Sequence, residues 1–160
     1  MVIILMGVTG SGKTTIGLAL AESLQWQFVD ADEFHSPANV AKMRAGLPLD
    51  DADRAPWLAA LHDTIAGWLE TPANVVLACS ALKQAYRRQL LVDSKVKLVY
   101  LRGSRELLAQ RLSQRHWHYM DPNLLASQFA TLEEPQDAVV VDVDADVPEI
   151  VAQIRTALGV

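Results

Sequence analysis

The feature that most constrains this chain is the run Gly7-Val8-Thr9-Gly10-Ser11-Gly12-Lys13-Thr14. It matches G-x-x-x-x-G-K-[S/T], the pattern of a phosphate-binding P-loop. An apolar stretch, Val2–Met6, precedes the run, and apolar residues at helical spacing follow it from Lys13 onward. A strand, this loop and a helix in that order form a phosphate-binding unit of α/β proteins. The run therefore predicts a nucleotide-binding α/β fold rather than a chance glycine-rich turn.

Each fixed position of the loop has a chemical reason. Gly10 and Gly12 allow tight turns that point backbone N–H groups inward, and the helix N-terminus adds partial positive charge there. We expect Lys13 to reach the β- and γ-phosphates of ATP as a catalytic residue, and the Thr14 hydroxyl to bind Mg²⁺. The predicted ATP site comprises Gly7, Val8, Thr9, Gly10, Ser11, Gly12, Lys13, Thr14 and also Thr15. The motif does not identify the acceptor of the phosphoryl group.

Composition excludes several classes of partner. The chain has 160 residues, 51% of them hydrophobic, and a formal net charge of −5. This charge argues against a broad nucleic-acid or membrane surface. The single cysteine, Cys79, excludes an internal disulfide and suits the reducing cytoplasm. The first apolar stretch is too short to span a bilayer and lacks the basic flank of a signal peptide. We expect a cytoplasmic protein.

Short apolar runs alternate with amphipathic helical stretches along the chain, a pattern typical of a parallel sheet with helices on both faces. The expected strands are Val2–Met6, Gln27–Asp30, Val75–Cys79, Val96–Leu101 and Ala138–Val143. Ser36 and Pro37 indicate a helix start, Gly46 its end, and the segment from Pro56 has a helical apolar stripe. We expect one three-layer domain, residues 1–160, in which residues 35–54 form an insertion that covers the site.

Asp30 and Asp32 close the second expected strand. Alternation along a strand would place both carboxylates on the same side, at the carboxyl end of the sheet where such folds bind ligands. Asp30 would help to hold hydrated Mg²⁺, and Asp32 would act as the catalytic base that accepts a proton from the attacking hydroxyl. A solvated acidic turn is the alternative interpretation.

Arg111 and Arg115 are spaced i, i+4 on an expected helix, Ser104–Arg115, just before an irregular segment rich in histidine and aromatic residues. We expect Arg111 to contact ATP, and Arg115 to act catalytically by stabilising charge on the transferred phosphoryl group. Residues 115–125 would form a short lid. An exposed polar helix face is the alternative.

Together with further short blocks, these residues resemble one family over nearly the whole chain. Beyond the P-loop, the blocks are Asp30–His35, Asn39, Lys42-Met43, Gly46, Pro48-Leu49, Asp51, Asp53-Arg54, Pro56-Trp57, Cys79–Lys83, Tyr86-Arg87, Gln128-Phe129, Leu132-Glu133 and Glu134-Pro135. The chain resembles the gluconate kinases, small relatives of shikimate kinase and adenylate kinase. The resemblance implies ATP-dependent phosphorylation of D-gluconate to 6-phospho-D-gluconate, a P-loop kinase fold with sheet order 2-3-1-4-5, and a homodimer. Pro135 is added to the predicted ATP site.

The residues themselves are compatible with a sugar-acid acceptor. Gluconate carries a carboxylate and a row of hydroxyls, so its pocket needs fixed cations and polar partners. The predicted substrate residues are Asp32, His35, Lys42, Arg54, Ser80, Lys83 and Arg87, with Arg54 or Arg87 holding the carboxylate. For each basic residue alone, the alternative interpretation is a solvated surface charge. The remaining alternatives are a kinase for another small hydroxylated acid, such as shikimate, and a nucleotide-binding module without transfer chemistry.

Overall fold

Five parallel strands form one sheet in the order β2-β3-β1-β4-β5, as the family resemblance implied. The computed structural model describes residues 1–114 and 122–160. The strands are β1 (Val2–Met6), β2 (Gln27–Asp30), β3 (Val75–Ala78), β4 (Val96–Arg102) and β5 (Val139–Asp142), each within one residue of its predicted bounds. In the register, Val2 of β1 lies opposite Val75 of β3 and Val96 of β4. The predicted α/β fold class is confirmed.

The composition of β1 explains why it is the central strand. All five of its residues are apolar and buried, because a strand with helices on both faces meets no solvent on either side. Val2, Ile4 and Met6 belong to one core, and Ile3 and Leu5 to the other. Successive side chains of a strand point to opposite faces, so one apolar run supplies both cores.

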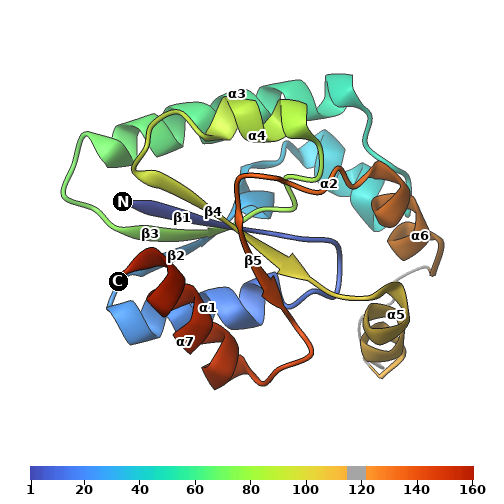
Figure 1. Ribbon diagram of the computed structural model, residues 1–160. Helices are drawn as coiled ribbons and strands as arrows, with labels where there is room; N and C mark the ends of the chain where they lie inside the picture. The colour runs from blue at the N-terminus through green and yellow to red at the C-terminus, as the bar shows by residue number, and fades with distance from the viewer. Residues whose placement is uncertain (115–121) are drawn as a thin grey trace.

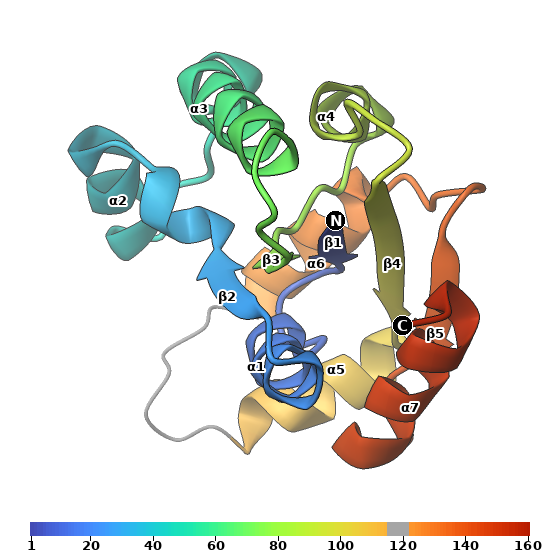
Figure 2. The same ribbon diagram turned by 90° about the vertical axis from the view of Figure 1, so that its left-hand side faces the viewer.

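Helices cover both faces of this sheet and gather at one end of it (Figures 1 and 2). Helices α3 (Asp51–Leu69) and α4 (Gln84–Leu90) pack together on one face, and α1 (Lys13–Leu24) and α7 (Val147–Leu158) pack together on the other. Helices α2 (Pro37–Arg44), α5 (Arg105–Ser113) and α6 (Pro122–Thr131) lie toward the end to which the strands point. Open α/β sheets bind their ligands at that end.

The start of α3 differs from the sequence-based expectation. The predicted apolar stripe starts at Pro56, whereas the helix itself begins earlier, at Asp51. The Asp50 side chain accepts from Asp53 N at 2.7 Å, and the Asp53 side chain accepts from Asp50 N at 3.0 Å, forming a capping box. Pro56 lies inside the helix, where it removes one backbone hydrogen-bond donor. Arg54 therefore lies on the first turn of a rigid helix.

Other local expectations are confirmed. Ser36 caps α2, because its Oγ accepts from Asn39 N at 3.2 Å, and Gly46 follows the helix with φ 73°. Cys79 is buried and reduced, and burial raises the pKa of its thiol to about 12. No helix in the described part of the chain is long and apolar enough to cross a membrane.

Candidate active site

The P-loop connects β1 to α1 in a conformation that only glycine adopts easily at two positions. Gly10 has φ 78° and Gly12 has φ 90°, both in the left-handed region. A Cβ atom at Gly10 would also lie 3.1 Å from Leu112 of α5. The loop is anchored by hydrogen bonds from Gly7 N to Ser80 O at 3.3 Å and from Ser11 N to Val8 O at 3.2 Å. The turn is therefore preformed and backed by α5.

The loop and the start of α1 offer donors to an anion. Gly12, the N-cap of α1, has no side chain to occupy the first-turn N–H groups, whereas α2, α3, α5 and α7 begin with a serine or aspartate that caps them. The Ser11 hydroxyl is buried, and among the described residues it has no hydrogen-bond partner. Thr14 and Thr15 are exposed on the first turn. These features fit a bound polyphosphate.

Lys13 lies over the mouth of the loop. Its Nζ donates to Gly7 O at 3.0 Å and to Val8 O at 3.1 Å. Burial lowers the pKa of Lys13, while the charges of Asp32 and of Asp30 oppose that shift. The ammonium is thus held by neutral carbonyl oxygens, with the two aspartates close enough to act on it through their charge.

Gln128 of α6 is a site residue to which the sequence reasoning gave no role. Its Oε1 accepts from Thr9 N at 2.6 Å, which ties α6 to the P-loop. The two residues are 119 positions apart, so only the family resemblance, which includes Gln128, pointed to it.

The reasoning that placed Asp30 and Asp32 on the same side of a strand is wrong. Strand β2 ends at Asp30, and Asp32 lies in a 3₁₀ turn, η1 (Ala31–Phe34). The Asp30 Oδ1 accepts from Asp32 N at 2.9 Å, and this local hydrogen bond turns the chain out of the extended conformation. Asp32 reaches the end of the sheet by this turn rather than by strand alternation.

Asp32 nevertheless has the electrostatics expected of a base. Its side chain is 71% exposed, yet enough protein surrounds the carboxyl to desolvate it in part. This partial burial, and then the nearby charge of Asp30, raise the pKa of the Asp32 carboxyl, while His35 and Lys13 oppose the shift. A carboxylate with a raised pKa accepts a proton more readily than a fully solvated one.

Two of the predicted substrate cations are paired with aspartates of α3. Lys42 Nζ of α2 lies 2.9 Å from Asp53 Oδ2, and Lys83 Nζ lies 3.1 Å from Asp51 Oδ1. These hydrogen bonds raise the pKa of each lysine, and the bond from Lys42 lowers the pKa of Asp53. The pKa of Asp51 is lowered first by a hydrogen bond from Tyr86 and then by the one from Lys83. The acceptor side of the site is thus a set of mutually neutralised charges.

Tyr86 of α4 joins these pairs and was missed as a site residue. Its hydroxyl donates to Asp51 Oδ1, and both Lys83 Nζ and the Arg54 guanidinium carbon lie 5.6 Å from its ring centre. Arg54 also donates to Leu49 O at 2.7 Å. Residues from three separate segments, Arg54, Lys83 and Tyr86, therefore meet at one place.

Arg87 differs from the other predicted cations, because it is buried, with 4% of its surface exposed. Its Nη1 donates to Ala81 O and to Leu82 O, both at 2.9 Å. Ala81 has φ 45°, a costly conformation for a residue with a side chain. Arg87 thus holds the strained loop that carries Ser80 and Lys83, and it contacts protein where a ligand contact was expected. Burial lowers its pKa.

The remaining predicted residues are more scattered. The Arg111 guanidinium donates to Val143 O, next to the end of β5, and Pro135 lies in the connection between α6 and β5. Helix α5 ends at Ser113, earlier than predicted, and Arg115 and residues 116–121 of the expected lid lie outside the described residues. Ser80 accepts from the P-loop through its carbonyl, and His35 lies beside Asp32.

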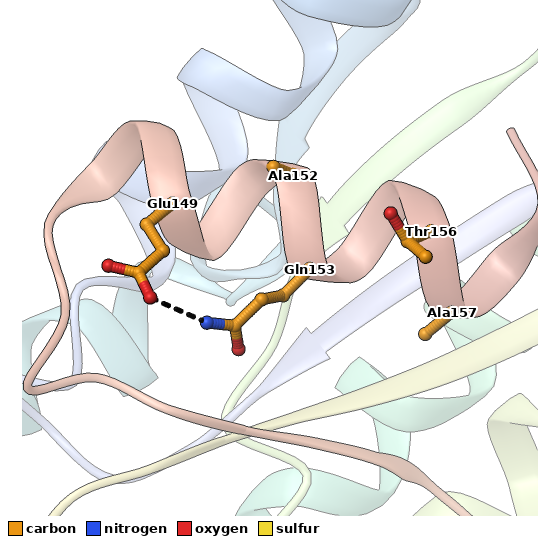
Figure 3. Close-up of a pocket in the computed structure, with 5 residues that line it drawn as sticks. All are labelled: Glu149, Ala152, Gln153, Thr156 and Ala157. Carbon is orange, nitrogen blue, oxygen red and sulfur yellow. Dashed lines mark hydrogen bonds between the residues drawn. The ribbon is translucent and has the colours of Figure 1, made fainter.

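Surface hollows elsewhere do not coincide with this arrangement. One of about 410 Å³ is lined by residues of α7 alone: Glu149, Ala152, Gln153, Thr156 and Ala157 (Figure 3). Gln153 Nε2 donates to Glu149 Oε1 along this helix at 3.3 Å. None of these is a predicted site residue, and all of them come from one helix. Among residues 1–114 and 122–160, no three acidic, histidine or cysteine side chains gather to hold a metal by themselves.

A P-loop at the carboxyl end of a 2-3-1-4-5 sheet, with an aspartate close enough to act on its lysine through charge, defines a small P-loop kinase. A family model described as shikimate kinase matches residues 9–158. A probable gluconokinase from Mus musculus is 43% identical over 98% of this chain and 97% of its own length. A gluconokinase crystal structure from Sinorhizobium meliloti 1021 is 41% identical, with a TM-score of 0.87 over 98% of this chain and 90% of that one. Shikimate kinase from Aquifex aeolicus shares the fold alone, at 19% identity and a TM-score of 0.61 over 99% of this chain and 96% of that one. The chain belongs to the gluconokinase family.

Proposed function

We propose that this protein transfers the γ-phosphoryl group of ATP to the 6-hydroxyl of D-gluconate, with Mg²⁺ as cofactor. The observation that carries the proposal is the meeting of Arg54, Lys83 and Tyr86, in a chain of the gluconokinase family whose P-loop lysine lies close enough to Asp32 to be affected by its charge. A kinase for a small hydroxylated acid needs this combination of phosphate loop, base and fixed cations.

In the transfer step, the Asp32 carboxylate accepts the proton of the attacking hydroxyl as its oxygen bonds to the γ-phosphorus. The bond from that phosphorus to the bridging oxygen breaks, and ADP keeps the electron pair. Lys13 would leave the carbonyls of Gly7 and Val8 for the β- and γ-phosphate oxygens, which carry full charges. We assign charge stabilisation to Arg115 and a further ATP contact to Arg111, as the sequence predicts.

Magnesium fits the residues present. Thr14 is exposed at the start of α1, and Asp30 is the last residue of β2, at the same end of the sheet. Mg²⁺ usually takes one or two protein oxygens and completes its shell with water and substrate phosphates, so a dedicated cluster of acidic ligands is not needed. When bound, the ion neutralises charge on the transferred group.

Recognition of the acceptor is assigned to the cations on the first turn of α3 and before α4. We propose that the gluconate carboxylate displaces Asp51 from Lys83 and Tyr86 and is held by Arg54 as well. Ser80 and Lys42 would contact the hydroxyl chain, while Arg87 supports the loop that carries Ser80. Residues 35–54 would cover the bound acceptor.

A coupled ATP-consumption assay over gluconate, glucose and shikimate tests this proposal. A pocket that pairs cations with a carboxylate leaves them unpaired when glucose binds, so kcat/KM for gluconate should exceed that for glucose by about a thousandfold or more. Comparable values for the two would contradict the gluconate assignment. Preference for shikimate would favour the acceptor that the matching family model names.

We also propose a cytoplasmic homodimer, from the family resemblance and from the composition. Sedimentation equilibrium over a range of concentrations measures the assembly directly, and a single species of 17.6 kDa at all concentrations would contradict the dimer.

A further inference from the structure

His35 belongs to a small network beside the proposed base. Its imidazole stacks on the indole of Trp57, with ring centres 4.4 Å apart and an angle of 11° between the planes, and its side chain is only 4% exposed. Trp57 Nε1 in turn donates to Ala31 O at 2.7 Å, in a buried position next to Asp32. The ring and the turn that carries Asp32 are therefore fixed to the same indole.

The hydrogen bonds of Asn39 determine which imidazole nitrogen carries the proton. Its buried amide places Nδ2 2.8 Å from Asp53 O and 3.3 Å from His35 Nδ1. A carbonyl oxygen only accepts, so the NH₂ end of the amide must face it, and the second hydrogen then points to Nδ1. Nδ1 has to be the acceptor, which puts the proton of the neutral ring on Nε2. Nε2 is the nitrogen that lies 3.9 Å from Asp32 Oδ1.

The surroundings keep this ring neutral. Burial lowers the pKa of His35 below its usual range, Asp32 opposes the shift, and Arg54 reinforces it. An imidazolium would also carry a hydrogen on Nδ1, directed at the hydrogen of the Asn39 amide. The network therefore presents Asp32 with a neutral N–H donor in a fixed direction.

We propose that His35 is a positioning residue, whose Nε2–H group donates to Asp32 Oδ1 in the reacting complex and leaves Oδ2 directed at the acceptor hydroxyl. The inference rests on the proposed function and replaces the expectation that His35 contacts the acceptor. The separation of 3.9 Å exceeds a hydrogen bond by about 1 Å. Rotation of the largely exposed Asp32 side chain closes that gap, because the stacked ring cannot move. A base oriented by a third group is a recurrent arrangement in catalytic sites.

Two substitutions of His35 separate this role from packing. His35→Phe keeps a flat ring on Trp57 but has no donor, and His35→Gln keeps an amide donor of similar reach but loses the stack. We expect His35→Phe to lower kcat about tenfold to a hundredfold, as misplacement of a catalytic group does, with both KM values within about twofold. His35→Gln should retain most of kcat. His62→Phe on α3, where Nδ1 lies 2.7 Å from Gln89 O, is the matched control and should leave kcat unchanged.

Other outcomes would overturn the inference. Retained kcat in His35→Phe with loss in His35→Gln would assign the ring to packing, and equal losses in both would leave the donor no role of its own. A raised acceptor KM with unchanged kcat would make His35 a substrate ligand. Nitrogen-15 NMR of the unmutated protein gives a test without substitution, because a proton found on Nδ1 of His35 contradicts the tautomer. Gluconate turnover by the unmutated protein tests the proposed function separately, and the variants can be compared on whichever acceptor it uses.

Discussion

The two halves of the site hold their charges differently. At the P-loop, Lys13 is bound by two neutral carbonyls, and no side chain caps the N–H groups of the first turn of α1. At the acceptor side, Lys42 and Lys83 are already paired with Asp53 and Asp51. A bound phosphate would find hydrogen-bond donors that carry no anionic partner. The acceptor carboxylate, in contrast, has to displace an aspartate from its lysine.

This difference bears on affinity and specificity. A preorganised cradle supplies electrostatic stabilisation without rearrangement during the reaction. Paired charges that exchange partners add little net affinity, but they penalise an acceptor that brings no charge of its own. We therefore expect substitutions at the cradle to affect mainly the rate of transfer, and those at the acceptor side to affect mainly the choice of acceptor.

The largest effect should come from Lys13→Ala. It removes the cation at the loop, so kcat/KM should fall by at least about a hundredfold. The fold should persist, because within the described part of the chain the ammonium donates to two backbone carbonyls of the loop itself. Lys95→Ala, an exposed lysine before β4, is the control and should retain full activity. A Lys13→Ala variant that kept most of its activity would contradict the role assigned to Lys13 in the P-loop.

Asp32→Asn should follow, with a fall in kcat of about a hundredfold and little change in ATP affinity, because the amide keeps the size but accepts no proton. Asp30→Asn should instead raise the Mg²⁺ concentration needed for half-maximal rate. Its amide oxygen can still accept from Asp32 N, which preserves the turn. Titration of activity with Mg²⁺ compares the two variants, and identical curves would refute the division of roles between the carboxylates.

A smaller and more selective effect is expected at the acceptor side. Arg54→Ala should raise KM for gluconate about tenfold and leave KM for ATP unchanged, since it removes a charged hydrogen bond. Arg87→Ala should instead lower Tm, because it leaves the carbonyls of Ala81 and Leu82 short of a donor, at about 1–3 kcal/mol of stability. Arg88→Ala, exposed on the same helix, is the control. An Arg87→Ala variant with unchanged Tm and a raised KM would restore Arg87 as a ligand.

The sequence predicted the P-loop better than it predicted the acceptor side. The P-loop and the strand bounds were predictable because a local motif and short apolar runs determine them. The pairs around α3 were not, because Lys42 and Asp53 are 11 residues apart, and Tyr86 and Asp51 are 35 apart. Asp32 was placed correctly at the sheet end by an incorrect argument, because a local hydrogen bond from Asp32 N to Asp30 ended the strand. Periodicity carries no information on such side-chain competition.

The smallest effect is expected at Arg102 and Asp142. Like the lysine–aspartate pairs of the acceptor side, they form an ion pair, but at the edge of the sheet. The residues lie opposite each other on β4 and β5, with Arg102 Nε 2.9 Å from Asp142 Oδ1, and about half of each side chain is exposed. Exposed pairs contribute little to stability and are screened by salt, so Arg102→Ala and Asp142→Ala should each change Tm by little more than the measurement error, and less at high salt. Neither should change KM for gluconate, whereas Lys42→Ala, which breaks a partly buried pair, should raise it. If Arg102→Ala raised the gluconate KM as much as Lys42→Ala does, the acceptor would be responding to the net charge of the protein. The cations of α2 and α3 would then lose their specific role in recognition.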